Sequence, residues 1–230
     1  MKRFLAFLSP VLCLGFATLW LVYDKEKNYY LAAAVVLLFS AVPFFMSFEK
    51  SKPSASELSL TACLIALAVV SRAAFYLIPQ VKPIGAVVVV SGVCLGAKRG
   101  YFVGAMSAFI SNFIFGQGVW TPFQMAALGT VGLISGLVFG KIQAKRIPLA
   151  ITGFLLCFAV YGFVVDSCSV LMMSAQPTLS SAITIYAAGA PFSLVFGLAT
   201  AVFLLLFGES FVKKINRIIV KYAILPEKNI

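Results

Sequence analysis

The chain has 230 residues, of which 62% are hydrophobic and 11% charged, and its mean hydropathy is +1.04. Soluble domains are about 45–50% apolar, so this composition excludes an ordinary soluble protein, and the apolar runs are continuous rather than alternating, which excludes a β-barrel. The net charge of +11 would indicate a nucleic-acid partner in a soluble protein, but here Lys and Arg lie in short loops and the tail, so we expect no nucleic acid.

Runs of about 20 apolar residues are long enough to cross a bilayer as helices. We therefore expect an all-α polytopic membrane protein with a two-helix N-terminal hairpin (1–48), a cytoplasmic linker (49–56), a six-helix membrane domain (57–212) and a basic cytoplasmic tail (213–230). The first run has no A-x-A-like cleavage site after it and is interpreted as a retained helix. The eight predicted spans are 4–23, 29–48, 57–78, 83–97, 100–116, 121–143, 148–172 and 180–210.

The distribution of basic residues predicts the orientation of these spans. With both termini inside, 14 of the 18 Lys and Arg residues fall in cytoplasmic segments, and only Lys25, Lys27 and Lys82 fall in outer loops. Basic residues concentrate on the cytoplasmic side of membrane proteins. We therefore place both termini in the cytoplasm, and expect the amphipathic tail to lie at the inner surface or to meet a partner subunit.

Two ionisable residues lie well inside predicted spans, and such residues are candidate functional groups because their burial in lipid is costly. Arg72 and Asp166 each lie about six residues from the outer end of a span, or roughly 9 Å below it at ~1.5 Å per residue. Matched depth and opposite charge predict that they form an ion pair or share a hydrated cavity. A structural ion pair and direct ligand contact both remain open.

The stretch SNFIFGQGVWTPFQMAALG (111–129) gathers polar groups at the same level. Thr121 and Pro122 resemble an N-cap and first-turn pair for the sixth span. Amides at membrane depth need partners, so we predict a pocket open to the outside, polar at its floor and aromatic at its walls. The candidate substrate-binding residues are Arg72, Tyr76, Gln80, Asn112, Gln117, Trp120, Thr121, Gln124, Tyr161 and Asp166.

Small residues at four-residue spacing occupy the inner half of the domain, where they permit close helix approach. Ala62 and Ala66 lie on the span 57–78, and Gly132, Gly136 and Gly140 on the span 121–143. The chain contains no His, no paired Cys motif, no P-loop and no catalytic Ser/His/Asp set, so we expect no metal site, no cofactor and no enzyme.

Residues 57–225 resemble the S components of energy-coupling factor (ECF) transporters. The resemblance rests on four stretches: ELSLTACLIALAVVSRAAFYLIPQVKPIGAVVVVSGVCLG, GYFVGAMSAFISNFIFGQGVWTPFQMAALGTVGLISGLVFG, YGFVVD and VFLLLFGESFVKKINRIIVKY. The second of these stretches contains the motif G-Q-G-x-W-T-P-x-Q-M at 116–125. The resemblance implies a six-helix core that captures a vitamin near its extracytoplasmic end. It also implies partners, namely a transmembrane coupling subunit and two ABC ATPases, with Ala62-x-x-x-Ala66 as the docking motif.

The resemblance further implies a ligand, and members with the G-Q-G-x-W-T-P pattern suggest cobalamin or another corrinoid. The alternatives are a different vitamin, such as riboflavin or a queuosine precursor, and a self-sufficient secondary transporter. A secondary transporter usually shows inverted repeats and an ion site at the midplane. No clear repeat is visible in the sequence, and Asp166 lies off-centre.

Overall fold

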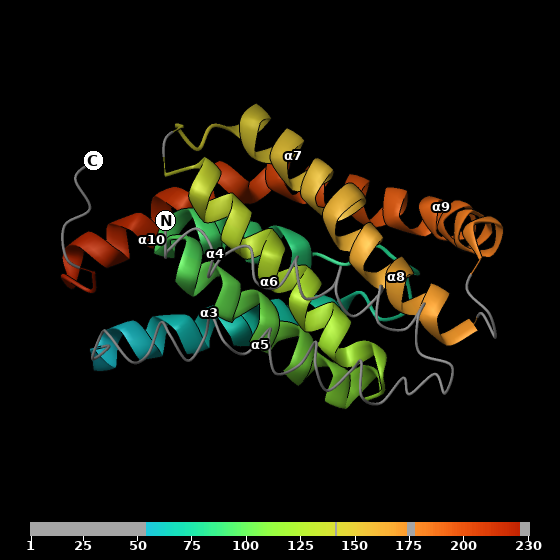
Figure 1. The fold of residues 1–230 in the computed structure, drawn as a ribbon. Coiled ribbons are helices and arrows are strands. Elements are labelled where there is room, and N and C mark those ends of the chain that lie inside the picture. The colour runs from blue at the N-terminus through green and yellow to red at the C-terminus, as the bar shows by residue number, and fades with distance from the viewer. Residues whose placement is uncertain (1–53, 141, 174–177, 226–230) are drawn as a thin grey trace, which may run out of the picture.

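The computed structural model describes residues 54–140, 142–173 and 178–225, and every regular element in these ranges is a helix (Figure 1). This confirms the all-α class. Each span predicted between 57 and 210 overlaps a helix, whereas the spans predicted at 4–23 and 29–48 lie outside the described residues. The elements are α3 (Ala55–Ala74), α4 (Ile84–Leu95), α5 (Ala97–Phe115), α6 (Trp120–Val138), α7 (Arg146–Leu155), the π-helix η1 (Leu156–Tyr161), α8 (Gly162–Met173), α9 (Leu179–Phe203), the π-helix η2 (Leu204–Gly208) and α10 (Glu209–Lys221).

Four helical runs are long and apolar enough to cross a membrane: α3, α6, Arg146–Met173 and Leu179–Lys221. The chain is therefore a multi-pass membrane protein. The helix α4 has only 12 residues, which corresponds to about 18 Å. Eleven of these residues are buried, so α4 is enclosed by other helices rather than facing lipid.

The helix ends follow local signals in the sequence. The Ser54 side chain accepts a hydrogen bond from Glu57 N at the start of α3, and Thr178 and Ser181 form a reciprocal capping box at the start of α9. These hydroxyls satisfy backbone donors that a helix N-terminus leaves free. Between α4 and α5 the only linking residue is Gly96, whose φ of 85° lies in the region that glycine tolerates best.

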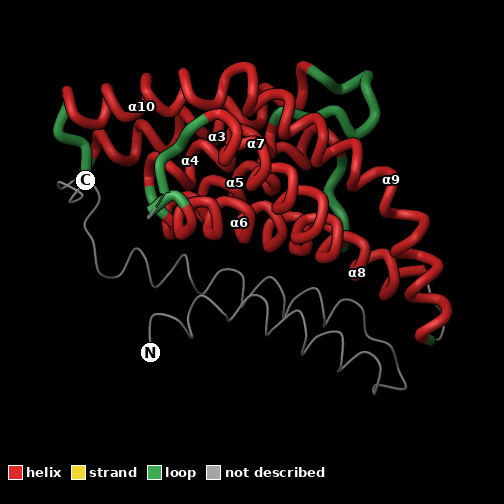
Figure 2. Tube along the Cα trace, turned by 90° about the horizontal axis from the view of Figure 1, so that it is seen from above, coloured by secondary structure: helices red, strands yellow, loops and turns green. Residues whose placement is uncertain are grey.

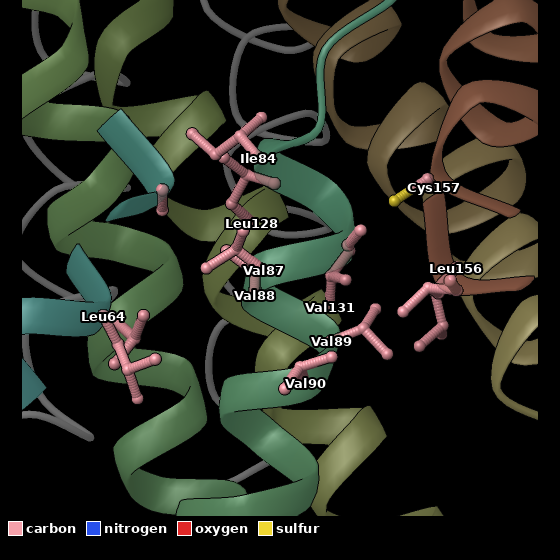
Figure 3. Packing of buried hydrophobic residues seen from close by; sticks show 14 of the residues in the cluster. Leu64, Ile84, Val87, Val88, Val89, Val90, Leu128, Val131, Leu156 and Cys157 are labelled. Atoms are coloured by element: carbon pink, nitrogen blue, oxygen red, sulfur yellow. The ribbon is translucent and has the colours of Figure 1, made fainter. Parts of the chain in front are cut away.

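The helix α4 forms the centre of the fold. It packs against α5 and α6 on one side and against α9 and α7 on the other, while α3 contacts both α4 and α5 (Figure 1). The side chains of Val87, Val88, Val89 and Val90 are all buried and join residues of α3, α6 and η1 in one apolar cluster (Figure 3). Burial on every side explains why this segment is apolar throughout rather than along one face.

Glycines bring α4, α5 and α6 into direct backbone contact. A methyl group at Gly132 would lie 2.5 Å from the carbonyl carbon of Gly100, and one at Gly100 would lie 2.6 Å from Cα of Gly92. The predicted close approach of small residues is thus present, and it joins three helices. Because the neighbouring atoms belong to the backbone, they cannot move aside as a flexible side chain could.

The last two helices form one continuous run along the length of the molecule, visible from both directions (Figures 1 and 2). In α10 the apolar residues Val212 and Ile215 are buried, whereas Lys213, Lys214 and Arg217 are exposed. The Sγ of Cys94 in α4 lies 3.9 Å from the carbonyl oxygen of Val212. The helix α10 therefore packs its apolar face against the bundle, as a continuation of α9.

We expect Gly132→Ala to destabilise the protein, because the added methyl group forces the α5 and α6 backbones apart. Overpacking of this kind costs about 1–3 kcal/mol, which should lower the thermal midpoint of the detergent-purified chain by several degrees. Gly140→Ala is the matched control, since its methyl group would lie 3.1 Å from the nearest atom at the exposed end of α6. Equal midpoints for the two variants would contradict the tight three-helix contact.

Candidate functional site

A pocket with a volume of about 620 Å³ opens between the α3–α4 connection, α6, α8 and the first half of α9. Its most buried lining residues are Ile84, Leu128 and Phe196, which belong to the central apolar cluster; Ile84 and Leu128 are labelled in Figure 3. The rings of Tyr161 and Phe196 lie with centroids 4.7 Å apart. These four residues, which we call the floor, make the base of the pocket apolar and aromatic, so the expected polar floor with aromatic walls is wrong.

Arg72 lines the pocket from the last turn of α3. Its Nη1 donates to Ser111 Oγ at 2.5 Å and to Asn112 Oδ1 at 2.9 Å, both on α5. The guanidinium carbon also lies 4.3 Å from the ring centroid of Phe115, a favourable cation–π distance. Two hydrogen bonds and one aromatic face therefore compensate for the withdrawal of this cation from water.

The side chain of Asn112 is 1% exposed and connects α5 to α6. Its Nδ2 donates to Thr121 Oγ1 at 3.0 Å and to Gln124 Oε1 at 2.9 Å. Thr121 Oγ1 in turn donates to Gln117 Oε1 at 2.9 Å. The polar residues at the end of α5 and the start of α6 thus form one hydrogen-bonded network that begins at Arg72.

The predicted helix cap at Thr121 is wrong. The helix α6 begins at Trp120, with Val119 as its N-cap residue and without a side-chain cap. The reason is that the Thr121 hydroxyl is engaged by Asn112, by Gln117 and by the backbone N–H of Gly118. Pro122 does occupy the first turn of the helix, as predicted.

Lys82 holds the α3–α4 connection in a compact shape beside the pocket. Its Nζ donates to the carbonyl oxygens of Phe75, Tyr76 and Ile78, which uses all three ammonium hydrogens. Burial and, to a smaller extent, the positive charge of Arg72 lower the pKa of Lys82 from its ordinary value. The lysine thereby satisfies carbonyl groups that the end of α3 leaves free.

The opposite wall of the pocket is formed by α8 and α9. Asp166, Ser169 and Thr184 line it, and the carboxylate of Asp166 lies against Gly189, where a methyl group would come within 2.5 Å of Oδ2. Among the described residues no ion pair joins Asp166 to Arg72. The two residues line the same pocket from different walls, which is the shared-cavity arrangement rather than the ion pair.

The structure distributes the ten candidate residues between the pocket and its surroundings. The lining includes Arg72, Tyr76, Gln80, Gln124, Tyr161 and Asp166. Asn112 and Thr121 are buried behind it, while Gln117 and Trp120 are exposed beside it and bond to backbone carbonyls of α5 and Gly116. Sequence reasoning did not identify seven further lining residues with charged, polar or aromatic side chains: Lys82, Phe115, Ser169, Thr184, Phe192, Ser193 and Phe196.

Helical spacing could have identified one of these residues. Ser169 is three positions after Asp166 on α8 and therefore lies on the same face. For Thr184 and Phe196 the sequence holds no comparable signal, because both lie in a long apolar run. The candidate docking residues Ala62 and Ala66 are exposed on the outward face of α3, one turn apart.

A family profile described as "ECF-type riboflavin transporter, S component" matches residues 52–218. The match covers about three quarters of the chain and includes every residue that lines the pocket. The chain therefore belongs to this family of S components, which are parts of transporters and not enzymes. No curated protein and no solved structure matched the chain.

We expect Arg72→Ala to destabilise the protein, because it leaves Ser111 and Asn112 buried without their cationic partner. Hydrogen bonds to charged groups contribute about 1.5–3 kcal/mol each, so the thermal midpoint in detergent should fall by several degrees. Lys214→Ala, which removes an exposed cation from α10, should leave the midpoint within about one degree. A similar midpoint for both variants would contradict the role of Arg72 in the network.

Proposed function

We propose that this chain captures riboflavin for import, as the S component of an ECF transporter, and that the ligand binds in the pocket between α3, α6, α8 and α9. The observation that carries the proposal is the family match over residues 52–218. It spans the whole pocket. The pocket volume of about 620 Å³ also falls within the range of about 300–1,000 Å³ typical of small-molecule sites.

The lining suits a flat heterocycle that carries a polar chain. Tyr161, Phe196 and Phe192 offer aromatic faces, against which a fused ring system can stack. Arg72, Gln124 and Asp166 supply charged and polar groups at separate points around the pocket. Riboflavin combines a three-ring isoalloxazine with a ribityl chain, so both kinds of surface have a counterpart in the ligand.

The family match favours riboflavin over the corrinoid that the G-Q-G-x-W-T-P pattern suggested. A corrinoid is much larger than a flavin and would need a wide, shallow mouth. The pocket instead has a volume of about 620 Å³ and a floor of buried residues that includes Ile84, Leu128 and Phe196. We therefore take riboflavin as the first ligand to test and cobalamin as the comparison.

We assign the pocket to the outer face of the bacterial cytoplasmic membrane, with both termini in the cytoplasm. Arg99 and Arg146 lie at the starts of α5 and α7, and the basic residues of α10 lie beyond the end of α9. The pocket lies at the other end of these helices, near the C-terminus of α5 and the start of α9. Basic residues on the cytoplasmic side support this orientation.

Energy for release of the ligand comes, in this proposal, from partner subunits. The chain carries no P-loop, so a transmembrane coupling subunit and two ABC ATPases would supply ATP hydrolysis. The face of α3 that presents Ala62 and Ala66 to the surroundings is suited to close contact with another helix. We propose it as the docking surface for the coupling subunit.

The detergent-purified chain should bind riboflavin with sub-micromolar affinity, measured by quenching of flavin fluorescence, and should not bind cobalamin. Gln124→Ala should weaken riboflavin binding roughly tenfold, because it removes a hydrogen-bonding group from the pocket. Gln143→Ala, at an exposed position outside the lining, should bind like the unmodified chain. Cobalamin binding without riboflavin binding would contradict the proposal.

The double variant Ala62→Leu/Ala66→Leu should bind riboflavin normally but abolish ATP-dependent uptake into vesicles that contain the coupling subunit and ATPases. The two leucines overfill the docking face and lie outside the pocket. Ala159→Leu, a similar enlargement at an exposed position of η1, should transport normally. Uptake driven by a proton gradient, with the chain alone and without ATP, would instead support a secondary transporter.

A further inference from the structure

The hydrogen-bonding groups of the pocket are sorted by type between its two walls. Arg72 and Gln124, on the wall formed by α3 and α6, present groups that can donate, whereas Asp166, Ser169 and Thr184, on the wall formed by α8 and α9, present groups that can accept. Ser193 on α9 also lines the pocket, and its hydroxyl can do both. This sorting follows from the partners that each side chain already has within the chain. It predicts which part of a ligand lies against which wall.

Arg72 determines the donor character of the first wall. A guanidinium can only donate, so the atom of Asn112 that faces Nη1 of Arg72 at 2.9 Å must be the oxygen. The amide nitrogen of Asn112 then points to Gln124 and donates to its Oε1 at 2.9 Å. With its oxygen engaged in this way, Gln124 directs its Nε2 donors elsewhere. Neither this nitrogen nor Nε and Nη2 of Arg72 has a hydrogen-bond partner among the described residues.

The second wall has acceptor character for a different reason. The hydroxyl of Thr184 donates to the carbonyl oxygen of Ser180 at 2.9 Å, and that of Ser169 is directed to the carbonyl oxygen of Val165 at 3.4 Å. Their hydrogens are thus occupied, and their oxygen lone pairs remain. Asp166 makes no hydrogen bond or ion pair with the part of the chain that the structure describes. An ionised carboxylate only accepts.

We propose that the pocket orients a flavin by this polarity: the carbonyl edge of the heterocycle lies against Arg72 and Gln124, and the hydroxyl chain lies against Asp166, Ser169 and Thr184. The inference rests on the proposed function and adds an orientation to it. Isoalloxazine presents two carbonyl oxygens and the ring nitrogens N1 and N5 as acceptors, with a single N–H donor between the carbonyls, and the ribityl chain presents hydroxyls that can donate. The aromatic rings of Tyr161 and Phe196 line the same pocket at its floor.

Asn112 is a positioning residue in this arrangement. It does not line the pocket. Because it accepts from Arg72 and donates to Gln124, it determines that the amide nitrogen of Gln124 is left free to donate. Replacement by Asp keeps the acceptor for Arg72 and removes the donor to Gln124. The Gln124 amide would then turn its nitrogen towards residue 112 and its oxygen towards the pocket, which reverses the character of that wall.

Two ligands that share a ring system separate the two walls experimentally. Riboflavin carries the ribityl chain, whereas lumiflavin carries a methyl group in its place, and binding of both to the full chain is measured by fluorescence quenching. Asp166→Ala should weaken riboflavin binding roughly tenfold or more and change lumiflavin binding less than about twofold. Gln124→Met, which keeps the shape but removes the donors, should weaken both ligands by the same roughly tenfold factor.

Asn112→Asp tests the positioning role. It should weaken both flavins roughly tenfold, and the double variant Asn112→Asp/Gln124→Met should be no weaker than Gln124→Met alone, because residue 112 acts through residue 124. Additive losses in the double variant would overturn this role. Circular dichroism and the elution profile establish that each variant is folded, and Gln143→Ala serves as the control with unchanged affinity for both ligands.

The possible outcomes distinguish this inference from the proposed function. If riboflavin binds but Asp166→Ala weakens both flavins equally, or neither, the assigned orientation is overturned and flavin capture stands. The same holds if Gln124→Met leaves lumiflavin binding unchanged. If the unmodified chain binds neither flavin, the proposed function is overturned and the orientation with it.

Discussion

The guanidinium of Arg72 is the group on which the arrangement of the pocket depends. A charge inside a membrane helix is costly unless nearby groups compensate for it, and here Ser111, Asn112 and the Phe115 ring do so. Because the cation can only donate, it fixes the direction of every hydrogen bond that follows, through Asn112 to Gln124. One ionisable side chain thus ties α3 to α5 and, indirectly, α5 to α6. It also gives the site its polarity.

The approximate positions of the helices could be predicted from the sequence, because the length of an apolar run and the residues that end a helix are local properties of the chain. The glycine spacing likewise indicated close helix approach. The sequence could not reveal that α4 is the enclosed centre, since an apolar helix is equally compatible with lipid and with protein on each face. The neighbours of Gly132 were unpredictable for the same reason: four-residue spacing defines a face of one helix, whereas the contact with Gly100 depends on how three helices cross.

The depth of the site along the bundle could be predicted from the sequence. The residues that line it could be predicted only in part. Counting residues from span ends placed Arg72 and Asp166 at one depth, and both line the pocket. The sequence does not show how each helix is rotated about its own axis. Asn112 was therefore predicted to contact the ligand, although it lies behind the lining. Thr184 was not predicted as a site residue, because a threonine whose hydroxyl bonds to the backbone of its own helix is common in membrane helices. Only the assembled walls distinguish it from other hydroxyls.

The π-helix η1 has a consequence for how α8 faces the pocket. A π turn holds one residue more than an α turn, and each residue advances an α-helix by about 100°. The extra residue therefore sets the angular phase of everything that follows it in the same run. If η1 were a regular α turn of the same residues, Val165 and Cys168 would occupy the directions now taken by Asp166 and Ser169, so an apolar side chain and a thiol would replace the two acceptors. The chemical character of that wall thus depends partly on the wide turn itself, so a change that converted η1 to a regular α turn of the same length would alter ligand preference while every lining residue remained in the chain.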